Sequence, residues 1–141
     1  SMDQISGQGN GLSVSRQLYK GDEALNESAP LKVGDKITVR LTVKADRDMD
    51  FVQIKDDRAA CMEPLQAVSG FRWSNGLGYY QATKDASTQF FIDQMRKGTY
   101  VIEYQVYVNR TGEYQAGIAT VQSAYAPEFG GHTGGYRVMV E

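Results

Sequence analysis

The sequence is poor in the residues from which catalytic and metal sites are usually built. It has one Cys and one His among its 141 residues. A single Cys61 can form neither an internal disulfide nor a Cys-based metal cage, and a Cys nucleophile would need a His beside it in space. The chain also has no Gly-x-Ser-x-Gly elbow. We therefore expect no enzymatic activity, no catalytic residue, no bound metal and no cofactor.

The chain also lacks long apolar runs and a concentration of basic charge. No stretch is long enough to span a membrane. Lys and Arg number 15 against 17 Asp and Glu, and the two signs are interspersed, so nucleic acid is not an expected partner. Residues 1–10 are rich in Gly, Ser, Gln and Asn, a composition typical of a linker or a tag remnant.

A convincing helical period is absent, and alternation with a period of two takes its place. In 36–44, Ile37, Val39, Leu41 and Val43 share one face, and polar residues occupy the other. Segment 100–108 alternates in the same way. Such alternation is typical of strands with one face in the core and one in water.

The remaining segments predict an all-β fold. We expect 109–112 to turn the chain so that 113–121 forms a hairpin with 100–108, and Tyr100 to act as a tyrosine corner. Further strands are expected at 12–19, 51–55, 79–83, 88–92 and 136–140. The prediction is an immunoglobulin-like antiparallel β-sandwich of about eight strands, with 11–141 as a single domain.

Three polar segments have both an ordinary interpretation and a chemical one. The acidic segments 46–50 and 55–58 contain oxygen ligands that suit calcium, but their interleaved Arg and Lys favour solvated turns with internal ion pairs. His132 stands in a glycine-rich segment, 129–135, which predicts a surface loop. A phosphate-binding loop would be followed by a helix, and here a predicted strand follows.

Segment 71–80 holds four aromatic side chains among glycines: Phe71, Trp73, Tyr79 and Tyr80. Exposed aromatic residues make good contact surface for sugars or for a protein partner. Trp73 and Tyr80 would equally serve as a plug at one end of the sandwich. The sequence leaves both interpretations open.

Several segments, taken in order, resemble the C-terminal domain of bacterial α2-macroglobulin-like proteins. They are 11–19, 31–39, 50–56 leading into Glu63-Pro64, 97–100 with the strand that follows, 112–114 and 125–128. The chain departs from the family pattern at 57–61, where a proline and a glycine are common. Cys61-Met62-Glu63-Pro64 faintly echoes a Cys-x-Glu-Gln thioester motif, but Pro64 has no side-chain amide to condense with the thiol.

The resemblance implies a role inside a larger protein. Such proteins are protease traps located outside the cytoplasm, in the periplasm or at the cell surface, and their bait and thioester belong to other domains. This chain would be a non-catalytic terminal domain that packs against the thioester-bearing domain, and it would meet target proteases only through its parent. The candidate interface consists of Phe71, Trp73, Tyr79, Tyr80, Tyr125, Pro127, Glu128 and Phe129. The alternative is a carbohydrate-binding or adhesive module that uses segment 71–80.

Overall fold

The structure is a computed structural model that describes residues 11–141; the predicted linker at 1–10 lies outside the described residues. Those residues contain thirteen strands and no helix, so none of their elements is a helix that could span a membrane. The strands are β1 (Leu12–Lys20), β2 (Glu23–Ala24), β3 (Lys36–Ala45), β4 (Met49–Asp57), β5 (Met62–Pro64), β6 (Gly70–Ser74), β7 (Leu77–Thr83), β8 (Ser87–Met95), β9 (Gly98–Val108), β10 (Gly112–Ala116), β11 (Ala119–Ser123), β12 (Gly130–His132) and β13 (Tyr136–Val140).

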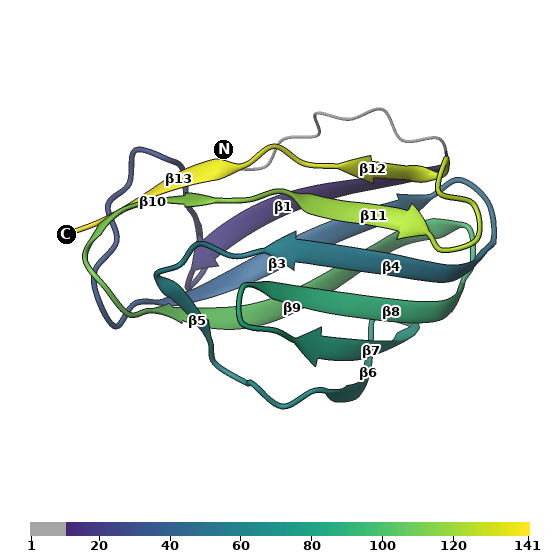
Figure 1. The fold of residues 1–141 in the computed structure, drawn as a ribbon, viewed down its shortest axis with the longest axis horizontal. Coiled ribbons are helices and arrows are strands. Elements are labelled where there is room, and N and C mark those ends of the chain that lie inside the picture. The colour runs from purple at the N-terminus through teal and green to yellow at the C-terminus, as the bar shows by residue number, and fades with distance from the viewer. Residues whose placement is uncertain (1–10) are drawn as a thin grey trace.

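Two sheets face each other to form an antiparallel sandwich. One has the strand order β2-β1-β3-β9-β5 and the other the order β12-β11-β4-β8-β7-β6, while β10 pairs with β13. Figure 1 shows β4, β8 and β11 in front of β1, β3 and β9. The predicted all-β sandwich is confirmed.

The core comes from the alternating strands. In β3, Ile37, Val39, Leu41 and Val43 are all buried, and the residues between them are more accessible. Strands β1 and β9 alternate in the same way and pair with β3 on its two sides. Each strand therefore contributes one apolar face to the same core.

The predicted hairpin between 100–108 and 113–121 is wrong. Strand β10 pairs with β13, and β11 pairs with β4 and β12. The chain changes partner at Gly117, where a Cβ atom would lie 2.7 Å from the Cβ of Asp57. Only glycine permits this close approach to β4. Ile118 follows the buried Ala116 by two residues and is exposed, so the alternation of β10 does not continue past this change of partner.

The expected number of about eight strands was too low. The additional elements include β2, β5 and β12, which have two or three residues each. Such pieces are too short to show alternation, which explains why the pattern missed them. The tyrosine corner is confirmed, because the Tyr100 hydroxyl donates to the carbonyl oxygen of Arg96 at 2.9 Å.

The two long sides of the sandwich differ. On one side β1 contacts β11 and β12 and brings the sheets together. On the other side a cleft lined by β7, β8 and β9 lies between the sheets.

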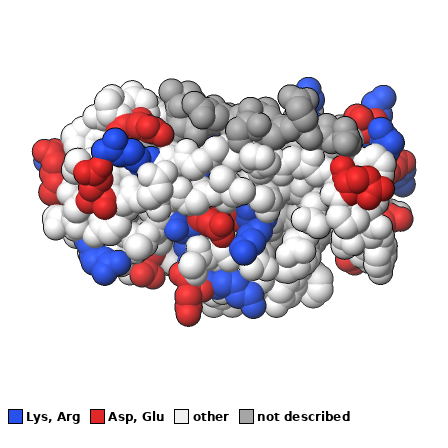
Figure 2. All heavy atoms as spheres, turned by 45° about the horizontal axis from the view of Figure 1, so that its top comes forward, with Lys and Arg blue, Asp and Glu red and all other residues white. Residues whose placement is uncertain are grey.

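Figure 2 shows acidic and basic side chains mixed in small groups on the visible face, with uncharged surface between them.

Candidate interaction surface

A tight hairpin positions the aromatic segment 71–80. Asn75 and Gly76 connect β6 to β7, with φ angles of 52° and 79°. Two successive positive φ values define the type I′ turn that Asn-Gly favours, and this turn matches the twist of the flanking strands. Segment 71–80 therefore forms two paired strands, and alternation sends neighbouring side chains to opposite faces.

One face of this hairpin carries what we term the outer aromatic face: Phe71, Trp73, Tyr80 and Phe91. Phe71 and Trp73 are 83% and 75% exposed. Phe71 stands opposite Tyr80 and Tyr80 opposite Phe91 in the sheet register. The rings of Phe71 and Tyr80 meet edge to face, with centroids 5.0 Å apart.

Glycine makes room for the indole. Trp73 stands opposite Gly78, and a Cβ at Gly78 would lie 3.1 Å from Cε3 of Trp73. The indole therefore lies across the backbone of β7. The interpretation of Trp73 as a core plug is wrong, because most of its side chain faces solvent.

A groove of about 690 Å³ runs along this face. Its lining joins the four aromatic residues to Asp93, Arg96 and Tyr100. Charges of both signs thus border an apolar floor, an arrangement common where a polar rim surrounds the core of a protein interface.

Tyr79 also lines the groove, but its ring points away from the outer aromatic face. It is 7% exposed, and its ring lies 5.8 Å from that of Phe90 in the core. The alternation of β7 explains the difference, since Tyr79 and Tyr80 must point to opposite faces of the sheet. Burial raises the pKa of the Tyr79 phenol above its ordinary value, so this hydroxyl stays protonated at neutral pH.

The other four candidate residues lie between β11 and β12. Tyr125 is 80% exposed, and its ring meets that of Phe51 edge to face at 5.0 Å. Pro127 and Glu128 are exposed. Phe129 is half-buried against the core, and the Arg47 guanidinium lies 4.9 Å from the centre of its ring.

The eight candidate residues therefore do not form one cluster. In the six-stranded sheet, β6 and β7 lie at one edge and β11 and β12 at the other. The interface predicted from sequence separates into an aromatic face at the first edge and a loop surface at the second. The first is the broader apolar surface and the stronger candidate for docking.

The most unusual polar group is one that the sequence analysis placed in a turn. Asp56 lies in β4, is 1% exposed and pairs with the equally buried Arg16 of β1. The Tyr104 hydroxyl donates to Asp56 Oδ2 at 2.5 Å. The prediction of a solvated acidic turn at 55–58 is thus wrong for Asp56. This residue follows Val52 and Ile54 on the inward face of β4, so its side chain points into the core.

Arg16 connects this pair to the closed side of the sandwich. Its Nη2 donates to the carbonyl oxygens of Gly117 and Gly134 at 2.7 and 2.9 Å, and its guanidinium lies 4.7 Å from the centre of the Tyr136 ring. Burial raises the pKa of Asp56, while Arg16 and the Tyr104 hydroxyl act in the opposite direction. We refer to Arg16, Asp56, Tyr104 and Tyr136 as the paired cluster.

The residues that the sequence offered for catalysis or metal binding lie in buried sites or in pairs with neighbouring groups. Cys61 is buried, and burial raises the pKa of its thiol. His132 is half-buried with Nδ1 2.9 Å from the Thr133 carbonyl oxygen. Asp46 pairs with Arg47, as expected for the segment 46–50. Within 11–141 no three His, Cys, Asp or Glu side chains gather as a metal site would require.

Comparison with known families identifies this sandwich. The family model described as "Bacterial Alpha-2-macroglobulin MG10 domain" matches residues 11–128. The chain belongs to the bacterial α2-macroglobulin MG10 domain family. The predicted resemblance is confirmed, and the sandwich described above is the fold of an MG10 domain.

Solved α2-macroglobulins contain the same fold. The Salmonella α2-macroglobulin mutant Y1175G is 20% identical with a TM-score of 0.79, over 97% of this chain and 10% of that one. Trypsin-activated α2-macroglobulin from Escherichia coli is 15% identical with a TM-score of 0.80, over 96% of this chain and 11% of that one. At these identities the likeness establishes the fold.

One curated relative is a protein that is not named as an α2-macroglobulin. "Circularly permutated Ras protein 2" of Dictyostelium discoideum is 29% identical over 138 residues, which cover 93% of this MG10 domain and 4% of that protein. The chain thus spans about a tenth or less of the length of each of these three proteins.

Proposed function

We propose that residues 11–141 are a single non-catalytic terminal domain of an α2-macroglobulin-like protease trap. The domain packs through its outer aromatic face against the thioester-bearing domain of the same polypeptide. It meets target proteases only through the parent protein, which acts in the periplasm or at the cell surface.

The match of the MG10 family model to 11–128 carries the family part of this proposal. The exposure of Phe71 and Trp73 supports the docking part. Two large aromatic side chains that stand side by side in water are costly unless a partner covers them, and aromatic residues are enriched at the centres of interfaces.

A trapping assay on the full-length parent tests the proposal. The parent is mixed with a broad-specificity protease, and cleavage of a large protein substrate and of a small peptide is followed in parallel. A trap protects the large substrate while the peptide is still cut. Unchanged cleavage of both substrates would contradict the role.

Variants of the parent test whether protection of the large substrate depends on the outer aromatic face. In the parent, Phe71→Ser combined with Trp73→Ser should reduce protection of the large substrate. Val33→Ser removes another exposed apolar side chain, outside the aromatic face, and should leave protection unchanged. Full protection by the double variant would contradict docking through this face.

A second candidate is glycan binding on the same face, favoured by the groove of about 690 Å³ beside Trp73. Trp73 is the only tryptophan, so its fluorescence reports on this surface alone. Emission that shifts saturably when a glycan is added would favour the binding module. Emission that glycans leave unchanged would favour docking. Tyr79, which points into the core, is not part of this platform.

A further inference from the structure

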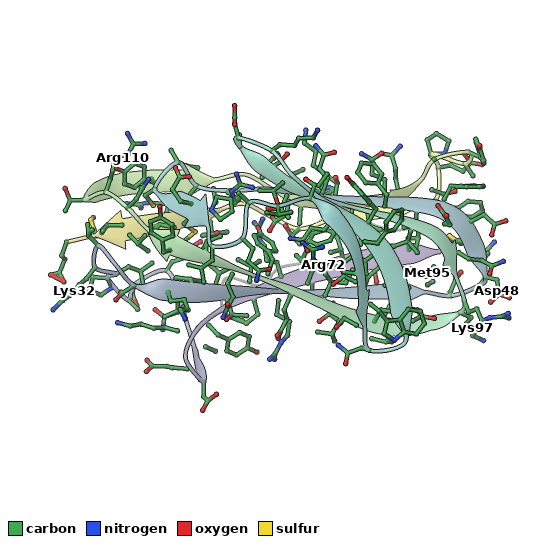
Figure 3. All side chains as sticks on the ribbon, turned by 90° about the horizontal axis from the view of Figure 1, so that it is seen from below. Lys32, Asp48, Arg72, Met95, Lys97 and Arg110 are labelled. Atoms are coloured by element: carbon green, nitrogen blue, oxygen red, sulfur yellow. The ribbon has the colours of Figure 1, made fainter. Side chains whose placement is uncertain are left out.

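A polar cleft separates the two sheets on the open side of the sandwich. It encloses about 320 Å³, at the lower end of the range of small-molecule sites, about 300–1,000 Å³. Figure 3 looks at this side and places Arg72 near the middle of the long axis, between Lys32 and Arg110 at one end and Asp48 and Lys97 at the other. Arg72 is one of the lining residues.

The inward face of β7 changes character along its length. Its inward positions are Leu77, Tyr79, Gln81 and Thr83, so two apolar or aromatic residues are followed by two polar ones. Gln81 is 8% exposed and lines the cleft, and its amide makes no hydrogen bond to the described residues. Its amide atoms are not among the fully buried polar atoms that lack a partner, so they remain accessible to a hydrogen-bonding ligand in the cleft.

Other polar side chains beside Gln81 line the same cleft. The hydroxyl of Tyr79 lines the same cleft without a hydrogen bond to the described residues, and Thr83 Oγ1 is buried without a partner. Thr38, Gln66, Thr88 and Gln105 complete an uncharged polar lining. Among them, Thr88 Oγ1 already accepts from Arg58 Nη1, and Thr38 Oγ1 accepts from Gln105 Nε2 at 3.5 Å. These amides and hydroxyls can each donate and accept hydrogen bonds.

Of the two charged residues that line the cleft, Glu103 has a counter-ion, whereas Arg72 has only backbone partners among the described residues. Glu103 pairs with Arg40. Arg72 donates from Nη1 to the carbonyl oxygen of Phe71 at 3.2 Å and from Nη2 to that of Val68 at 2.8 Å. A cationic ligand would find no unpaired carboxylate in this lining, whereas a ligand with several hydroxyl groups would match its amides and hydroxyls.

The connection between the sheets frames this site. Residues 65–69 lead from β5 in one sheet to β6 in the other. Leu65 N donates to the Gln105 carbonyl oxygen at 2.9 Å, and Thr83 N donates to Ser69 Oγ at 3.1 Å. Both ends of the connection are thus fixed to strands that line the cleft.

We infer that this cleft binds a small uncharged polyhydroxyl ligand, the size of a simple saccharide, with Gln81 and Tyr79 as its principal hydrogen-bonding residues. The site is separate from the outer aromatic face, because Tyr79 and Gln81 point inward from β7, opposite to Tyr80. It does not depend on the proposed docking function.

Titration of the ¹⁵N-labelled chain with glucose, N-acetylglucosamine and maltose, followed by NMR, tests this inference. The expected result is a saturable shift of the side-chain amide signals of Gln81 and Gln105 with at least one of the three sugars. Gln81→Met should weaken binding about tenfold or more, the effect of losing roughly 1.4 kcal/mol. Gln122→Met, which changes an exposed glutamine of β11, serves as the matched control and should bind as the wild type does.

Three outcomes would overturn the site: no saturable shift with any of the sugars, shifts confined to Trp73 and its neighbours, or undiminished binding by a folded Gln81→Met variant. Tyr79→Phe gives a second measurement that keeps the ring and removes only the hydroxyl. It should weaken binding without altering the fold, and unchanged affinity would contradict the assigned role of Tyr79.

Discussion

The same sandwich contains two groups of polar side chains between its sheets, and they differ in pairing. In the paired cluster, Asp56 accepts from both Arg16 and Tyr104. In the cleft, Thr83 Oγ1 is buried without a partner among the described residues, and the Gln81 amide makes no hydrogen bond to them. Both groups lie on inward faces of alternating strands.

The difference in pairing assigns a structural role to the paired cluster and a binding role to the polar groups of the cleft. Buried polar groups that satisfy one another stabilise one arrangement of the strands, and removing one partner is costly. Buried polar groups without partners contribute nothing comparable to the fold, so their removal should be tolerated. Substitution in the two groups should therefore have opposite consequences.

The largest effect is expected for Asp56→Ala. This change removes the carboxylate that balances the buried charge of Arg16, and the free energy of unfolding should fall by about 3–5 kcal/mol. Urea denaturation measures it. The control is Asp57→Ala on the same strand, whose surface pair with Lys55 is worth at most about 1 kcal/mol. Equal losses in the two variants would contradict the role of the paired cluster.

A matched pair of tyrosines compares the two groups with one chemical change. Tyr104→Phe removes a hydrogen bond to a charged group and should cost about 1.5–3 kcal/mol. Tyr79→Phe removes a hydroxyl that makes no hydrogen bond to the described residues, and should change the free energy of unfolding by less than about 0.5 kcal/mol. Similar losses, again measured by urea denaturation, would show that the cleft is structural.

A smaller effect of opposite sign is expected for Thr83→Val. The substitution keeps the branched shape and removes a buried hydroxyl that lacks a partner, so stability should stay level or rise by up to about 1 kcal/mol. Thermal unfolding monitored by circular dichroism is sufficient to detect it. A clear loss of stability would mean that the Thr83 hydroxyl supports the fold.

Cys61, which directly precedes β5, tests local opening of the fold without any substitution. The thiol is buried, and burial raises its pKa, so little reactive thiolate is present at neutral pH. We expect Ellman's reagent to react with the native chain far more slowly than with the chain in urea. Rapid reaction of the native protein would indicate that this region opens readily.

Much of the fold was predictable from alternation, because β1 and β3 bury one face along almost their full length and β9 does so from Ile102 onward. The paired cluster was also signalled. Arg16 follows Leu12 and Val14 in β1, and Asp56 follows Val52 and Ile54 in β4, so the period of two places both charges inside. Their pairing was not predictable, because 40 residues separate them along the chain.

The candidate surface was predicted only in part. Asn75-Gly76 is a strong hairpin signal, and applied to 71–80 it separates inward Tyr79 from outward Trp73 and Tyr80. The wide separation of Phe71 from Tyr125 depends on strand order, which no local pattern contains. The change of partner at Gly117 has the same origin, since it depends on the close approach of β4.

Docking through the outer aromatic face is the central functional claim, and thiol labelling tests it most directly. Because Cys61 is buried, a Phe71→Cys variant introduces a single accessible thiol into the chain. The labelling rate is compared between the isolated chain and the full-length parent, whose other accessible cysteines are replaced, with Val33→Cys as the reference position. The account predicts rapid labelling of Phe71→Cys in the isolated chain and at least about tenfold slower labelling in the parent. Equal rates in the two proteins would mean that no neighbouring domain covers this face, and would contradict the account.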